Sequence, residues 1–109
     1  MMKKTIPQTR SLKDYLKENE RDPAYRAALN RARLRVAIAR AIKTARERSG
    51  LTQAELANAL QLPQSVIGRL ESLKDKRLPS VELLARIVGV TQKPLAIDYG
   101  AVRIKVLAS

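Results

Sequence analysis

The chain has 109 residues, about the length of one domain, and its hydrophobic content of 45% is ordinary for a globular protein. It contains neither cysteine nor histidine, which excludes a disulfide framework, thiolate or imidazole metal ligands, and the usual general base. Twenty-two Lys and Arg against ten Asp and Glu give a net charge of +12, which favours a polyanionic partner such as nucleic acid.

The N-terminal part of the chain is polar and basic. Residues 1–10 are polar and contain Pro7, so we expect a mobile tail. They lack the apolar segment of a secretory signal. No stretch approaches the ~18 consecutive apolar residues of a membrane span. We therefore expect a cytoplasmic protein without a membrane partner. Ser11 is a candidate N-cap for a short helix over residues 12–20.

A long helix is predicted next. Asp22 followed by Pro23 is typical of a helix start, since a capping side chain precedes a proline at the first helical position. Apolar residues then recur every three or four positions up to Ser49, without Gly or Pro. The predicted helix is longer than usual, which leaves room for a break near Asn30. Gly50 is expected to end it.

Two short helices joined by a tight turn follow. Thr52 and Glu55 have the spacing of a capping box, which predicts a helix to about Leu60. Residues 61–63 (QLP) break this helix, and residues 64–72 are predicted to form the next one. Two such helices in a basic protein satisfy the geometry of a helix-turn-helix.

The second of these helices has two different faces. Its apolar residues fall on one side, where they can pack on the preceding helix. Its other side presents an amide, a hydroxyl and a guanidinium, which can read base edges in the major groove. These candidate base contacts are Gln64, Ser65 and Arg69. A basic loop follows, and its candidate phosphate contacts are Lys74, Lys76 and Arg77; the alternative is a merely solvated loop.

The elements of the C-terminal part are predicted from residues that typically begin or end helices. Ser80 can cap a helix that ends at Gly89, and Thr91 can cap a fifth helix that ends near Tyr99. Residues 102–106 alternate apolar and basic side chains, as a strand does. Because an isolated strand leaves its backbone unpaired, we expect it to pair with its copy in a twofold dimer. Pairing with another protein or fraying are the alternatives. The dimer contacts would be Val102, Ile104 and Val106.

The helix-turn-helix segment resembles a known family. Residues 50–57 (GLTQAELA), with Gln64, Ile67 and Leu70-Glu71, are similar to the Xre/Cro/CI family of DNA-binding proteins, over about residues 38–91. The resemblance implies an all-α, five-helix, lambda-repressor-like domain in which Gln64 opens the recognition helix. It also implies DNA backbone contacts at Gln53 and Thr52, and an ion pair between Arg46 and Glu71.

Three positions depart from the family pattern. Gln61 stands where the turn usually has glycine, so either a non-glycine residue adopts a positive φ or the turn differs. Pro63 replaces the usual capping Ser or Thr. Gly68 replaces a residue that often touches DNA, which predicts a sparser interface.

The segment before the domain suggests a narrower role. Residues 22–28 (DPAYRAA) resemble antitoxins of the HigA type. This implies a type II toxin–antitoxin protein that neutralises a RelE/HigB-like mRNA-cleaving toxin and represses its own operon. The candidate toxin contacts are apolar: Leu12, Tyr15, Leu16 and Tyr25. An acidic toxin-binding cluster, or an extension that packs only on its own domain, are the alternatives.

The predicted organisation has three parts. Residues 1–35 form the extension, residues 36–100 the helix-turn-helix domain and residues 101–109 the C-terminal strand. We expect a homodimer that binds double-stranded operator DNA, without enzymatic activity, cofactor or metal. A plain Xre-family repressor without a toxin partner is the first alternative, and an RNA- or ribosome-binding protein is the second.

Overall fold

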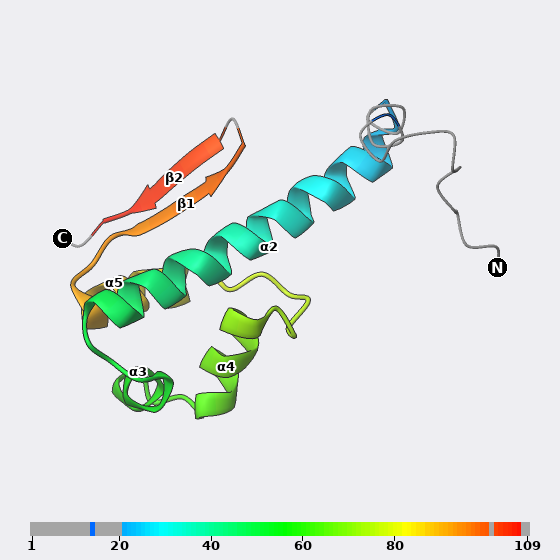
Figure 1. Cartoon of the computed structure of the whole chain (residues 1–109). Helices are drawn as coiled ribbons and strands as arrows, with labels where there is room; N and C mark the ends of the chain where they lie inside the picture. Colours follow the sequence, from blue (N-terminus) through cyan, green and yellow to red (C-terminus); the bar gives the residue numbers. More distant parts are fainter. Residues whose placement is uncertain (1–13, 15–20, 101, 108–109) are drawn as a thin grey trace. The chain divides into compact units, whose positions relative to one another are not determined.

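The computed structural model describes Asp14 and residues 21–100 and 102–107. Within them the chain forms four helices and a two-stranded antiparallel sheet (Figure 1). The elements are α2 (Pro23–Arg48), α3 (Gln53–Ala59), α4 (Gln64–Ser72), α5 (Val81–Thr91), β1 (Leu95–Tyr99) and β2 (Val102–Val106). The chain divides into two compact units, residues 1–32 and 33–109; α2 begins in the first, and the hydrophobic core described below belongs to the second. The tail and short helix predicted over residues 1–20 lie outside the described residues, apart from Asp14.

Helix α2 begins and ends as its flanking residues predict, and it is continuous along its length. The carboxylate of Asp22 accepts a hydrogen bond of 3.0 Å from the backbone N–H of Ala24, which caps the helix start. At the other end Gly50 adopts a φ of +76°, and the N–H of Leu51 donates to the carbonyl of Arg46 at 3.1 Å. This is a Schellman motif, which satisfies carbonyls that the helix itself leaves open.

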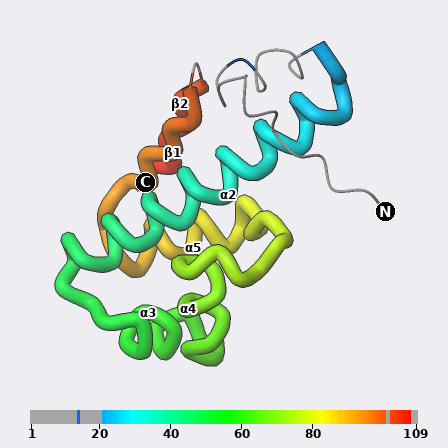
Figure 2. The backbone as a smooth tube through the Cα atoms, turned by 45° about the vertical axis from the view of Figure 1, so that its right-hand side comes forward, coloured from blue at the N-terminus to red at the C-terminus, as the bar shows by residue number. Residues whose placement is uncertain are grey.

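The turn between α3 and α4 is built without glycine. The capping box of α3 is present, since the Thr52 hydroxyl accepts from the N–H of Glu55 and the Glu55 carboxylate accepts from the N–H of Thr52. After α3 ends, Gln61 adopts a φ of +57°, so the non-glycine residue does take the left-handed conformation. Pro63 then leads into α4. Figure 2 shows the two short helices lying side by side.

One hydrophobic core holds α3, α4, α5 and β1 against the C-terminal half of α2. Each of these elements contributes at least one side chain with almost no solvent exposure. The largest of them are Ile42, Leu56, Leu60, Ile67, Ile87, Val88 and Leu95. Ile67 is the buried side chain of α4, and its packing decides which face of α4 turns outward.

The prediction of a fifth helix was wrong. Helix α5 runs through Gly89 to Thr91, whose hydroxyl donates to the carbonyl of Ile87 and accepts from the N–H of Lys93, but no helix follows. Gln92, at a φ of +54°, ends α5. Residues 95–99 are then the strand β1, in which buried and exposed residues alternate. Residues 95–99 form a strand and not the predicted helix because they pair with β2, and a local sequence pattern does not reveal such a contact between two segments.

The strand predicted over residues 102–106 is present as β2, but its pairing partner belongs to the same chain. It lies antiparallel to β1, with Val102 opposite Tyr99 and Val106 opposite Leu95, and Gly100 in the connecting turn has a φ of +80°. The need for backbone partners, on which the expectation of a dimer was based, is thus met on one edge of β2 within the chain.

Arginine side chains close the C-terminal ends of three helices. The last carbonyls of a helix lack intrahelical donors, and a guanidinium can supply them. The carbonyls at or just beyond the ends of α2, α3 and α4 each accept a hydrogen bond of this kind. Arg46 donates to Leu51, Arg86 to Leu60 and Arg35 to Leu73. These bonds hold the chain where it leaves each helix.

Candidate nucleic-acid interface

Helix α4 presents a polar face to solvent above a buried apolar face. Gln64, Ser65 and Arg69 are all exposed, whereas Ile67 has no exposed surface and Leu70 packs against the core. Ser65 and Arg69 are one turn apart and Gln64 precedes Ser65, so the three side chains emerge on one broad side of the helix. This is the arrangement that lets a helix enter a groove while its other side stays in the protein.

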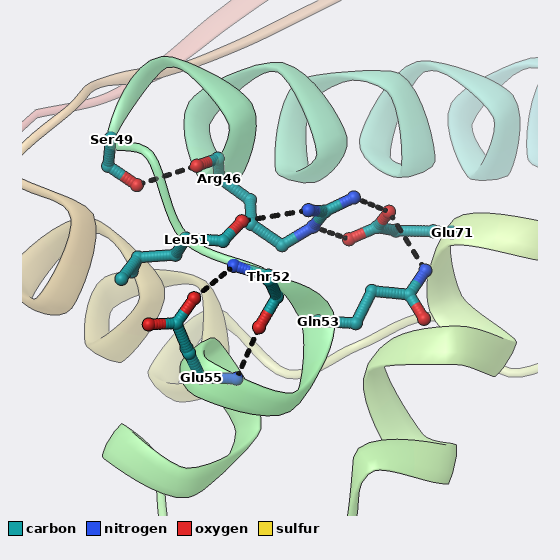
Figure 3. Close-up of polar contacts among 7 residues, drawn as sticks. All are labelled: Arg46, Ser49, Leu51, Thr52, Gln53, Glu55 and Glu71. Atoms are coloured by element: carbon teal, nitrogen blue, oxygen red, sulfur yellow. Dashed lines mark hydrogen bonds and ion pairs between the residues drawn. The ribbon is translucent and has the colours of Figure 1, made fainter.

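A buried ion pair fixes α4 from behind (Figure 3). The guanidinium of Arg46 donates to both carboxylate oxygens of Glu71, at 2.7 and 2.8 Å, and the two side chains are only 12% and 4% exposed. The amide of Gln53 donates to the same carboxylate at 3.3 Å. The hydrogen bond to Glu71 is the main cause that raises the pKa of Arg46 above its ordinary value. One carboxylate therefore joins α2, α3 and α4.

A hollow of about 360 Å³ lies beside this ion pair. Its lining residues come from α2, α3 and α4 and are Lys43, Arg46, Gln53, Gly68, Glu71 and Ser72. Lys43 was not among the predicted contacts, although it precedes Arg46 by three residues and therefore shares its face of α2. At Gly68 an added Cβ would lie 3.6 Å from Gln53 Oε1, an ordinary contact, so space does not require glycine there.

The two residues predicted to contact the DNA backbone at the start of α3 both take part in hydrogen bonds within the protein. Thr52 is exposed, but its hydroxyl oxygen already accepts from the N–H of Glu55. Gln53 is half-buried, because its side chain turns toward Glu71. Hydrogen bonds from Thr52, above all from its backbone N–H, hold the pKa of Glu55 below its ordinary value. Both candidate residues are thus held in place at the helix start.

The loop after α4 carries the predicted basic residues on its surface. Lys74, Lys76 and Arg77 are all exposed. The carboxylate of Asp75 accepts from the backbone N–H of Arg77 at 3.0 Å and from its Nε at 3.4 Å. The first of these bonds is the main cause that holds the pKa of Asp75 below its ordinary value. The loop is therefore an ordered turn with cations on its outer side.

The remaining predicted contacts lie elsewhere. Tyr25 is half-buried on α2, whereas Leu12, Tyr15 and Leu16 lie outside the described residues. On β2, Val102 and Ile104 are 43% and 41% exposed, and Val106 packs partly against the core. Arg35 and Arg86 were not among the predicted residues, because they bond to backbone carbonyls, which every residue type carries.

A capped short helix, a tight turn and a second helix with an outward polar face define a helix-turn-helix. A family model described as helix-turn-helix matches residues 42–97, which is more than half of the chain. The chain belongs to this Xre-type helix-turn-helix family and is a DNA-binding regulator of transcription. No curated protein and no solved structure matches it. Among the described residues, no helix is long and apolar enough to cross a membrane.

Proposed function

We propose that the chain is a sequence-specific repressor that reads operator DNA through α4. The observation that carries this proposal is the exposure of Gln64, Ser65 and Arg69 on a helix whose opposite side is anchored by the buried Ile67. Glutamine can bond adenine and arginine can bond guanine in a bidentate manner, and serine can bond either base. No enzymatic step forms part of the proposal.

The DNA backbone contacts surround this helix. Thr52 and Gln53 stand at the start of α3, and the exposed cations Lys74, Lys76 and Arg77 follow α4. Such contacts set the register and the affinity of the protein on DNA and carry no base sequence themselves. Lys43, at the rim of the hollow beside Arg46, is a further candidate of the same kind.

Arg69→Ala tests the base-reading part of the proposal. Binding to an operator selected from a random-sequence library should weaken by about 1–3 kcal/mol, with relaxed preference at one base pair. Arg40→Ala is the matched control, because Arg40 is exposed on α2. An equal loss on selected and random duplexes would make Arg69 a backbone contact and remove it from base reading.

We also propose that β2 contributes to a homodimer. Within the described residues β2 pairs only with β1, so its outer edge is open to another strand. Val102 and Ile104 add exposed apolar surface there, and the dimer would place two recognition helices ~34–36 Å apart. Ile104→Glu should lower the mass seen in sedimentation, whereas Ala96→Glu, on the other face of the hairpin, should not. An unchanged mass for Ile104→Glu would contradict this interface.

The antitoxin role is the narrower proposal. It is supported by the resemblance of residues 22–28 to HigA-type antitoxins, and its apolar contacts would be Leu12, Tyr15, Leu16 and Tyr25. Tyr15→Asp together with Tyr25→Asp should abolish binding of a co-expressed RelE/HigB-like toxin and leave DNA binding intact. Absence of toxin binding by the unaltered chain would favour a plain repressor. Preference for RNA over duplex DNA at fixed salt would favour the RNA-binding alternative.

A further inference from the structure

Arg35 reaches from α2 to the basic loop that follows α4. Its Nη2 donates to the carbonyl of Leu73 and to the carbonyl of Asp75, both at 3.0 Å. These two carbonyls lie two residues apart, so one guanidinium group spans the first turn of the loop. The path of the chain through residues 73–75 is therefore fixed by a side chain that stands about forty positions earlier in the sequence.

The loop needs such support at Leu73. This residue ends α4 with a φ of +63°, in the left-handed region where glycine is the usual residue. A side chain with a Cβ is disfavoured there, and the conformation persists only where neighbouring groups hold it. The hydrogen bond from Arg35 to the carbonyl of Leu73 is a contact of this kind.

Stability alone does not account for an arginine at this position. Its Nε–H is buried without a hydrogen-bond acceptor among the described residues, and a cavity of about 10 Å³, the space of one water molecule, lies against the side chain. Its two partners are neutral carbonyls rather than a carboxylate. Burying an N–H donor without an acceptor in this way is unfavourable. The arrangement is what we expect of a residue that serves the geometry of the loop.

We propose that Arg35 is a positioning residue for DNA binding. It holds the loop so that Lys74, Lys76 and Arg77 meet successive phosphates, and it does not touch DNA itself. This inference rests on the backbone role given to the same three residues in the proposed function. It extends the DNA-binding machinery to a residue that lies before the matched family region, residues 42–97.

The salt dependence of binding to a short duplex of random sequence tests the proposal, because the slope of log K against log salt counts phosphate contacts. Arg35→Gln and Arg35→Lys should each reduce the slope by about 0.9 or more, the contribution of one phosphate. Arg33→Gln is the matched control: it removes the same charge from an exposed position nearly opposite on α2, and its slope should equal that of the unaltered chain.

The lysine variant separates positioning from direct contact. A lysine keeps the charge, but its side chain is one bond shorter, so its ammonium does not reach the position of Nη2, the atom that bonds both carbonyls. If Arg35→Lys keeps the full slope while Arg35→Gln loses it, Arg35 touches phosphate itself and the proposal is overturned. All slopes are measured below the melting temperature of each variant. If Arg35→Gln does not fold, Arg35→Lys carries the test alone.

A third variant distinguishes failure of this inference from failure of the proposed function. Replacing Lys74, Lys76 and Arg77 together by Gln should lower the slope further than either Arg35 variant. If it does so while the Arg35 variants bind like the unaltered chain, the positioning role is wrong and the phosphate contacts stand. If the triple variant keeps the full slope, the loop contacts no DNA, and both the positioning role of Arg35 and the backbone role of the loop are wrong.

Discussion

Two arginines of α2 hold the C-terminal end of α4 and the loop that follows it, and they do so with different partners. Arg46 pairs with the carboxylate of Glu71 in an interior where the two side chains are 12% and 4% exposed. Arg35 bonds the neutral carbonyls of Leu73 and Asp75 at a half-buried position. Losing one member of the first pair leaves a charge buried alone, whereas losing Arg35 leaves only carbonyls that water can reach. The helix is therefore fixed more strongly than the loop that follows it.

The largest effect expected from this comparison is at the ion pair. Arg46→Ala should destabilise the protein by about 3–5 kcal/mol, because Glu71 would remain buried without its partner. Urea denaturation measures the change. The double variant Arg46→Ala with Glu71→Ala should lose less than the sum of the two single variants. Additive losses would mean that the two side chains do not depend on each other.

The start of α3 follows Leu51, whose carbonyl accepts a hydrogen bond from Arg46. A variant at this helix start shows whether the N-cap contributes stability next to the ion pair. Thr52→Ala should cost about 1 kcal/mol, since it removes one half of the capping box. Thr44→Ala, at an exposed position within α2, is the control and should change stability far less. Equal losses in the two variants would show that the cap contributes nothing beyond a surface threonine.

A stabilising change is expected at Gly68, which lines the hollow beside the ion pair of Arg46 and Glu71. Gly68→Ala should stabilise the protein by about 0.5–1 kcal/mol, because alanine is the better helix former and its Cβ would make an ordinary 3.6 Å contact with Gln53 Oε1. Thermal unfolding measures the gain. A loss of stability would show that the amide of Gln53 cannot tolerate the methyl group.

The smallest expected effect is a response of the loop to acid. The pKa of Asp75 is lowered by its hydrogen bond from Arg77, so this contact contributes fully above the ordinary value of 3.8 and is lost as the pH falls below it. The protection factor of the Arg77 amide, which compares its exchange with that of an unstructured peptide at the same pH, should therefore fall at acidic pH. Asp75→Asn should remove most of this pH dependence, and an unchanged profile in that variant would assign it to another group.

Local signals explain which elements could be predicted from the sequence. The capping box, the cap at Ser80 and the glycine after α2 each act within a few residues, and the structure contains all three. The prediction of a fifth helix was wrong although the Thr91 hydroxyl does accept from the N–H of Lys93, because Thr91 is the last residue of α5 and residues 95–99 pair with β2 as a strand. Strand β1 was missed because its five residues form a strand only when they pair with β2, a contact that no local signal indicates.

The candidate site was predictable to a similar extent. The outward face of α4 follows from helical periodicity, since Ile67 and Leu70 must turn inward. The ion pair of Arg46 and Glu71 was implied by resemblance, because residues 25 positions apart give no local sign of contact. Arg35 could not be found in this way, since its acceptors are backbone carbonyls that every residue carries.

The guanidinium groups that cap the ends of three helices also affect the affinity for polyanions. Arg35, Arg46 and Arg86 direct N–H groups toward the protein's own backbone. Donors used in this way are not available to displace the ions condensed on a duplex. The net charge of +12 therefore overstates how many cations the protein exchanges on binding. Its hold on DNA should weaken less with added electrolyte than its composition alone would suggest.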